Sequence, residues 1–326
     1  MYTRHVIELT ACTKIGCARS VPVIIFTAEL PPQGVNPPGV RILGAKRAEV
    51  TWKEPLIKNG KILGYQIIVN AISRPTLRTI VLNATADQRL VEIFNLTAGV
   101  LYSFRLKTIN GGGATTSSAT FRRTKESSPE NIPAPKIRGL SPYSIIVTIL
   151  DPGLPNGNIT RYELYKVVGP AEHLVLNGTE KVYNESGLEP YTQYYFRSKI
   201  CTAKGCGSSV VGNGFTLEAA PNGSVILNVS LLNSTTAHAF WSSVHSPNGI
   251  LYYNLVVQGL FLIPGSSGYH VENDTRMVAW VQHPVGELTY TGLLPYTSFT
   301  FQINASNSVG FLLSNVVLRK TAQGGQ

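Results

Sequence analysis

Apolar and polar residues alternate over short stretches of this chain, and a tyrosine-rich version of the pattern recurs. Residues 188–196 read Leu-Glu-Pro-Tyr-Thr-Gln-Tyr-Tyr-Phe, and residues 293–301 read Leu-Leu-Pro-Tyr-Thr-Ser-Phe-Thr-Phe. Residues 96–104 hold a weaker copy, and residues 2–7 a truncated one. Further alternation and a glycine-bearing turn follow each copy, as a strand and a hairpin require. The pattern therefore predicts an array of similar β units.

The copies recur at roughly 90 to 105 residues, which indicates three units and a remnant in a chain of 326 residues. Before the tyrosine phrase, 48–52 and 237–241 each end in a tryptophan, whereas the middle unit has Ser-Ile-Ile-Val-Thr-Ile at 144–149. We expect both indoles in the core. An Asn-Gly turn follows in all three units, and this dipeptide supplies the positive-φ positions of a tight turn.

Proline marks the junctions between the units, each time after a strand end and an acidic residue. The acidic residues are Glu29, Glu126 and Glu218. Proline cannot donate to a β ladder, so it stops a strand and stiffens a short connection. We predict a semi-rigid rod. Its parts are a C-terminal hairpin at 1–30, followed by complete units at 31–126, 127–218 and 219–326.

The core tryptophan, Asn-Gly turn, tyrosine phrase and glycine hairpin together resemble the fibronectin type III repeat. The resemblance implies an all-β chain of tandem, immunoglobulin-like, seven-stranded β-sandwiches. It also implies a tyrosine corner, in which a hydroxyl bonds to nearby backbone, at Tyr102 and Tyr194. His5 and Phe299 take that place in the other copies, and Phe299 has no hydroxyl to form the bond. The expected core residues are Trp52, Trp241, Tyr102, Tyr194 and Phe299.

The four cysteines form two similar pairs, Cys12 with Cys17 and Cys201 with Cys206. Each pair straddles a predicted tight hairpin, so the two sulfurs can face one another and close a local disulfide. Such bonds suit an oxidising compartment. Reduced thiols are the alternative. Zinc is disfavoured because each pair offers two ligands and a whole unit lies between the pairs.

Ten Asn-x-Ser/Thr triplets occur, more than the composition gives by chance, and they indicate glycosylation in a secretory pathway. No stretch approaches the roughly 20 apolar residues of a membrane span, and no secretory signal is evident at the start. We expect a piece of a longer secreted or membrane-anchored extracellular chain. The acceptor asparagines are Asn83, Asn95, Asn158, Asn177, Asn184, Asn222, Asn228, Asn233, Asn273 and Asn304.

The formal charge of +10 is dispersed, and residues 122–125 form its only tight cluster. We interpret that cluster as a solvated strand end, with a polyanion-binding patch as the alternative. Nucleic-acid binding is disfavoured because no recognition helix or zinc spacing accompanies the charge. The six histidines match no metal-ligand motif, and no nucleophile elbow occurs. We therefore expect no enzyme activity, catalytic residue, metal or cofactor.

The remaining candidates for recognition are the hairpin tips at 13–16, 111–116 and 202–205. A cross-linked tip loses less entropy on binding, which favours a preorganised contact. Simple protection of the hairpin from proteolysis explains the bridges equally well.

We expect a glycosylated structural and adhesive spacer with extracellular protein partners. The Cys-Thr-x-x-Gly-Cys hairpins and the Pro-Tyr-Thr phrase also resemble repeats of a very long basement-membrane and hair-cell link protein. That resemblance implies a basement-membrane or sensory-cell-projection setting, with roles in hearing and vision. The first alternative is the ligand-binding ectodomain of a receptor phosphatase or cytokine-type receptor. The second is an accessory module of a secreted carbohydrate-active enzyme.

Overall fold

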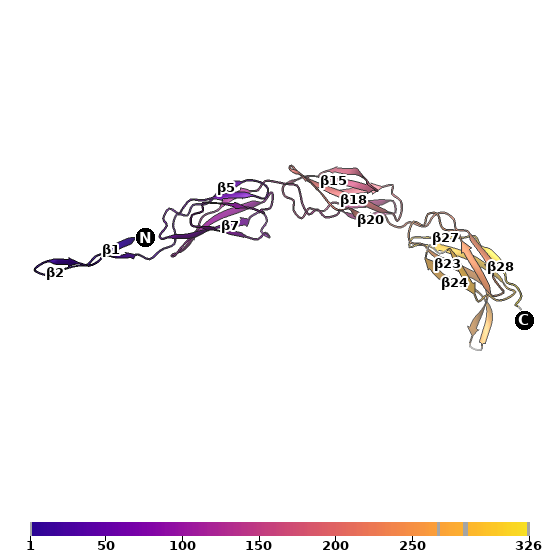
Figure 1. Ribbon diagram of the computed structural model, residues 1–326. Coiled ribbons are helices and arrows are strands. Elements are labelled where there is room, and N and C mark those ends of the chain that lie inside the picture. Colours follow the sequence, from indigo (N-terminus) through magenta and orange to yellow (C-terminus); the bar gives the residue numbers. More distant parts are fainter. Residues whose placement is uncertain (1, 266–267, 283–285, 325–326) are drawn as a thin grey trace.

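The computed structural model describes residues 2–265, 268–282 and 286–324. All regular secondary-structure elements in these residues are β-strands. The strands gather into three sandwiches that follow one another in an elongated, bent row (Figure 1). This arrangement confirms the predicted all-β class. The exact boundaries at 30, 126 and 218 stay predictions.

Each sandwich packs a three-stranded sheet on a five-stranded sheet. The first sandwich pairs β5 (Gly39–Ile42), β6 (Ala48–Thr51) and β9 (Leu90–Ile93) in one sheet, and β7 (Ile62–Ala71), β8 (Ile80–Thr85), β10 (Leu101–Asn110), β11 (Gly113–Thr116) and β12 (Thr120–Arg123) in the other. Strands β11 and β12 both pair with β10, so together they act as one interrupted strand. Counted in this way, the sandwich has the seven strands that the sequence predicts.

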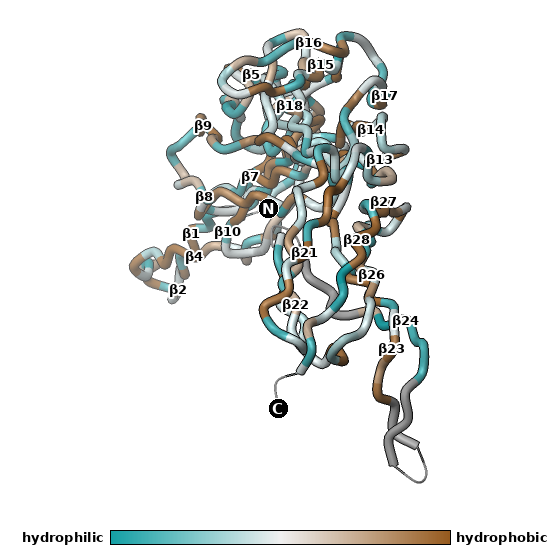
Figure 2. The backbone as a smooth tube through the Cα atoms, turned by 90° about the vertical axis from the view of Figure 1, so that its right-hand side faces the viewer, coloured by the Kyte–Doolittle hydropathy of each residue, from teal (hydrophilic) through white to brown (hydrophobic). Residues whose placement is uncertain are grey.

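The other two sandwiches repeat this order. The second consists of β13 (Lys136–Ser141), β14 (Ser144–Thr148), β15 (Ile159–Val168), β16 (Ala171–Gly178), β17 (Val182–Ser186), β18 (Gln193–Thr202), β19 (Gly205–Ser208) and β20 (Gly212–Phe215). The third consists of β21 (Leu227–Leu231), β22 (Thr236–Trp241), β23 (Tyr252–Gly265), β24 (Gly268–Gln282), β25 (Glu287–Thr291), β26 (Ser298–Ser306), β27 (Phe311–Leu313) and β28 (Val317–Lys320). The hairpin of β23 and β24 projects beyond the body of its sandwich, and the coloured stretch of β24 at its label is hydrophilic, whereas that of β23 beside it is hydrophobic (Figure 2).

Ahead of the first sandwich lies an extended pair of hairpin segments. Strand β1 (Arg4–Ile7) pairs with β4 (Val23–Phe26), and β2 (Thr10–Cys12) pairs with β3 (Cys17–Arg19). Every residue of these four strands is exposed. The segment therefore has no buried core of its own, as a lone hairpin is too small to form one.

Trp52 and Trp241 lie in the cores of the outer sandwiches. Trp52 is 6% exposed and its ring lies 5.6 Å from that of Tyr65, while Trp241 is 7% exposed and lies 5.4 Å from Tyr253. In the middle sandwich Ile149 fills the corresponding place and is buried. The same core position thus accepts an indole or an aliphatic side chain.

Candidate functional site: linker clamps and hairpin tips

A glutamate in each linker is held by the sandwich that follows it. Its carboxylate accepts a hydrogen bond from a backbone amide just after the Asn-Gly turn, 32 positions further along in every case. The three pairs are Lys61 N with Glu29 Oε1 at 3.0 Å, Asn158 N with Glu126 Oε1 at 3.0 Å, and Ile250 N with Glu218 Oε1 at 2.8 Å. We call this arrangement the linker clamp.

The turn asparagine supplies the second part of the clamp. Its side-chain amide donates to a linker carbonyl, and its own carbonyl accepts from a linker amide. The side-chain bonds run from Asn59 to Pro31 O at 3.0 Å, from Asn156 to Ser128 O at 2.9 Å, and from Asn248 to Ala220 O at 2.9 Å. Asparagine suits this place because its φ is positive in all three turns (50°, 56° and 51°), a conformation it tolerates well.

The turn requires glycine mainly because the linker glutamate occupies the space that a side chain would need. A Cβ on Gly157 would lie 2.7 Å from Glu126 Cδ, and one on Gly249 would lie 2.7 Å from Glu218 Cδ. Gly60 approaches Glu29 in the same way. The prediction that both Asn and Gly adopt positive φ holds only for the first turn, where Gly60 has φ 155°. In the other two, glycine lets the glutamate approach closely.

The hairpin tips form the third part of the clamp. Asn110 Nδ2 donates to Leu30 O at 2.8 Å, Thr202 Oγ1 to Ser127 O at 3.0 Å, and Asn307 Nδ2 to Ala219 O at 2.6 Å. The hairpins that carry the predicted contact tips at 111–116 and 202–205 therefore donate hydrogen bonds to the linkers that precede their sandwiches. The tip at 13–16 differs, since Ile15 there is 98% exposed.

The clamp of the third sandwich also sets the ionisation of its glutamate. Burial by itself raises the pKa of Glu218, but hydrogen bonds from the Ser308 hydroxyl and from the backbone amides of Ile250 and Ser308 outweigh burial and lower the pKa. The carboxylate therefore stays ionised at neutral pH. A charged acceptor forms the stronger kind of hydrogen bond.

Direct contacts reinforce the junction between the first two sandwiches. Lys46 Nζ lies 2.9 Å from Glu130 Oε1, and Arg74 Nη2 donates to Gly153 O at 2.9 Å. Both side chains of the ion pair are about half exposed, at 54% and 45%, so the pair stabilises weakly. The backbone of Gly99 also lies directly against Asn156 and Gly157.

The structure joins Cys12 to Cys17 and Cys201 to Cys206, each across neighbouring strands with Cα atoms 4.0 Å apart. The two bridges differ in surroundings. Cys12 and Cys17 are exposed, whereas Cys201 is fully buried. The bridge at Cys201 therefore belongs to the body of its sandwich as well as to the tip.

A buried carboxylate, Glu163, lies on the sheet that carries this second bridge. It accepts from Arg161 Nε at 2.7 Å and from the Tyr165 hydroxyl at 2.8 Å, and Lys199 Nζ lies at 3.5 Å. Burial raises the pKa of Glu163, but these hydrogen bonds and charges together lower it below its usual value. The carboxylate is thus ionised and fully partnered.

Two tyrosine corners are formed. Tyr102 Oη accepts from Thr97 N at 2.9 Å, and Tyr194 Oη accepts from Glu189 N at 3.0 Å. Phe299 has no hydroxyl and instead packs against Phe261 with ring centroids 5.3 Å apart. Tyr102 and Phe299 are buried, and Tyr194 is half-buried. His5 is exposed.

Nine of the ten acceptor asparagines are exposed. Asn304 is the exception. It lies in the central strand β26 between β23 and β27, is half-buried, and its Oδ1 atom is buried without a hydrogen-bond partner among the described residues. The acceptor side chain of this one triplet is therefore less accessible than those of the other nine.

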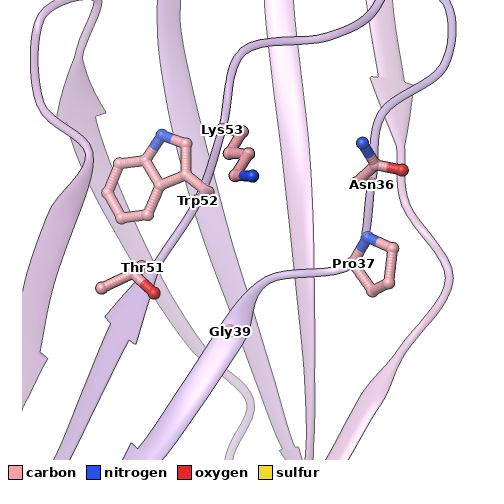
Figure 3. A pocket seen from close by; sticks show the side chains of 6 residues that line it. All are labelled: Asn36, Pro37, Gly39, Thr51, Trp52 and Lys53. Carbon is pink, nitrogen blue, oxygen red and sulfur yellow. The ribbon is translucent and has the colours of Figure 1, made fainter.

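A hollow of about 450 Å³ lies beside the core tryptophan of the first sandwich (Figure 3). Its lining residues are Asn36, Pro37, Gly39, Thr51, Trp52 and Lys53. The only charged group there is one lysine, so no acid and base converge. Within the described residues no group of three or more His, Cys, Asp or Glu side chains could hold a metal ion. His283 and the side chain of His270 lie outside the described part.

The paired sheets, tyrosine corners and repeated turns define an array of fibronectin type III repeats. Residues 31–124 match the family model described as fibronectin type III domain and belong to that family. Over 319 residues the chain is 34% identical to usherin from Mus musculus and 33% identical to usherin from Homo sapiens, so its repeats are usherin-like. The match covers 97% of this chain but 6% of each usherin.

A more distant relative is the phosphatidylinositol phosphatase PTPRQ from Homo sapiens, 28% identical over 78% of this chain and 11% of its own length. A crystal structure of chicken CNTN1 FN1–FN3 domains aligns with 90% of this chain and 100% of its own, at a TM-score of 0.47 and 17% identity. None of the described residues forms a helix of the length and hydrophobicity that crossing a membrane requires.

Proposed function

We propose that this segment is a non-catalytic extracellular spacer, a glycosylated rod within a large usherin-like link protein. It holds its flanking parts apart at a set distance and offers hairpin tips and sheet faces to extracellular proteins. The usherin-like repeats support a place in a basement membrane or on a sensory-cell projection. Nine exposed glycosylation triplets support the extracellular setting.

The observation that carries this proposal is the linker clamp, present three times. A linker that only joined two domains would need none of these bonds, because short flexible connections suffice for that. Here the turn asparagine and the hairpin tip bind backbone amides and carbonyls of each linker, and the sandwich amide binds the linker glutamate. Such repeated bonding restricts the angle between neighbouring units, which a spacer requires.

The test replaces the segment within its parent protein by three sandwiches of equal length whose exposed faces are unrelated in sequence but which keep the linker glutamate, the Asn-Gly turn and the hydrogen-bonding residue of the hairpin tip. A spacer keeps its tethering activity after this exchange, since only length and stiffness are needed. In parallel, small-angle X-ray scattering of the 326-residue chain measures its maximum dimension. Loss of tethering with an unchanged dimension would contradict the spacer proposal.

A second candidate is a ligand-binding receptor ectodomain, favoured by the similarity to PTPRQ. This candidate predicts the opposite result, because unrelated sandwiches of the same length would not reproduce a specific binding surface. A single exchange experiment therefore separates the two proposals.

A further inference from the structure

The five-stranded sheet of the first sandwich contains no acidic residue in any of its strands, β7, β8, β10, β11 and β12. It does contain arginine and lysine in β10 and β12. The chain as a whole has 18 acidic residues to 28 basic ones, and none of the acidic ones falls in the strands of this sheet. This distribution gives this sheet a positive potential that nothing within it offsets.

Strand register places three of these cations on the outer face. Residues directly opposite each other point to the same side of a sheet. Arg105 lies opposite Ile68, Lys107 opposite Gln66, and Arg123 opposite Leu101. The intervening Phe104 and Leu106 are fully buried and mark the inner face, so Arg105, Lys107 and Arg123 point to solvent. We call these three residues the cationic face.

In the second sandwich, acidic residues neutralise the cations at the equivalent positions. Its Arg197 and Lys199 occupy the places of Arg105 and Lys107, three and five residues after the tyrosine corner. Arg197 Nη1 lies 2.7 Å from Glu172 Oε1, and Lys199 Nζ lies 3.5 Å from Glu163 Oε2. In this sandwich, therefore, the equivalent cations already have partners within the fold.

The first sandwich lacks both of those acids. Glu163 lies opposite Lys199, and the residue opposite Lys107 is Gln66. Thr79 takes the place of Glu172 and donates to Asn70 Oδ1 at 2.6 Å. No ion pair to Arg105, Lys107 or Arg123 exists within the described part of the chain, and Arg123 donates only to Gly99 O, at 2.6 Å.

We propose that the cationic face binds an extended sulfated glycan. Cations two residues apart on a strand are about 7 Å apart, and neighbouring strands are about 5 Å apart. The three positive charges therefore form a row that extends along β10 and across to β12. An extended polyanion, whose negative charges also follow one another along a chain, can contact all three. Gln66, opposite Lys107 in the neighbouring strand β7, extends the polar surface on one side of the cations. On the other side Phe121, 52% exposed on the same face as Arg123, offers its ring to the C–H face of a sugar. A protein partner would instead need a larger apolar centre.

The test measures the dissociation constant of the 326-residue chain for heparin as the probe. Asn83 lies on the same face, opposite Gln66, so all proteins carry Asn83→Gln to exclude a glycan there. The face variant combines Arg105→Gln with Lys107→Asn, the residue types of the third sandwich at these places. The control combines Lys136→Gln with Arg138→Gln, an exposed pair of equal charge and spacing in β13.

We expect the face variant to weaken heparin binding about tenfold and the control less than twofold, because each lost ion contact contributes modestly. Circular dichroism verifies that both variants remain folded. Equal weakening by the two variants would overturn the proposal, since net charge alone would then explain the binding. Equally tight binding of poly-glutamate would also overturn it and would assign the face to an acidic protein.

Discussion

Gly157→Ala tests whether the turn glycine exists to admit the linker glutamate. The added methyl group would lie 2.7 to 2.9 Å from three side-chain carbons of Glu126, so the carboxylate must leave. Its bond from Asn158 N, 3.0 Å long, is then lost, at about 1 to 2 kcal/mol for a partly exposed charged acceptor. The φ of Gly157 is not among the positive ones, so alanine adds no backbone strain there.

The decisive measurement is a double-mutant cycle with Glu126→Ala. Amide hydrogen exchange at Asn158 should accelerate about 5- to 30-fold in either single variant, which corresponds to about 1 to 2 kcal/mol. Once Glu126 is gone, Gly157→Ala has nothing to displace and should be neutral or stabilising by about 0.5 kcal/mol, because alanine restricts the unfolded chain.

The control for this cycle is Gly178→Ala. A Cβ there would meet no atom within 4 Å, so exchange at Asn158 should not change. If Gly157→Ala lowered protection as much without Glu126 as with it, the close approach of the glutamate would not be the reason for this glycine.

Four further outcomes are expected. Trp52→Ala should destabilise the first sandwich by about 3 to 5 kcal/mol in urea unfolding, since the indole is 6% exposed; a loss under 1 kcal/mol would reject the core placement. Replacing Cys201 and Cys206 by alanine, which avoids burying a hydroxyl at the fully buried Cys201, should reduce stability by only about 2 kcal/mol, because the bridge closes a short loop, and unfolding of the variant at room temperature would contradict this. The pKa of Glu163 is lowered in the folded state, so its contribution is present above the unfolded pKa of about 4.3 and is lost as pH falls through the folded value. Glu163→Gln should remove that part of the pH dependence of unfolding. Peptide mapping of protein from animal cells should find lower glycan occupancy at the half-buried Asn304 than at the nine exposed acceptor asparagines, and equal occupancy would contradict this reasoning.

The hydrophobic pattern by itself determined the repeat and its fold class. A period of two identifies strands, and the spacing of the tyrosine phrase gives the unit length, because each copy must bury one similar core. Two cysteines five positions apart across a short hairpin also face one another by local geometry alone. The recurrence of an acidic residue 30 positions before each turn asparagine, as from Glu126 to Asn156, was a usable signal for the clamp.

Tertiary structure alone decided what these residues do to one another. Sequence places Glu126 in a linker and Gly157 in a turn, but only folding shows that the carboxylate needs the space a side chain would fill. In the same way, Arg105 and Arg123 come from different strands, and the neutral Gln66 comes from a third. Alternation fixes the face of each residue within its own strand, whereas the neighbours across that face depend on strand register, a long-range property that local patterns do not contain.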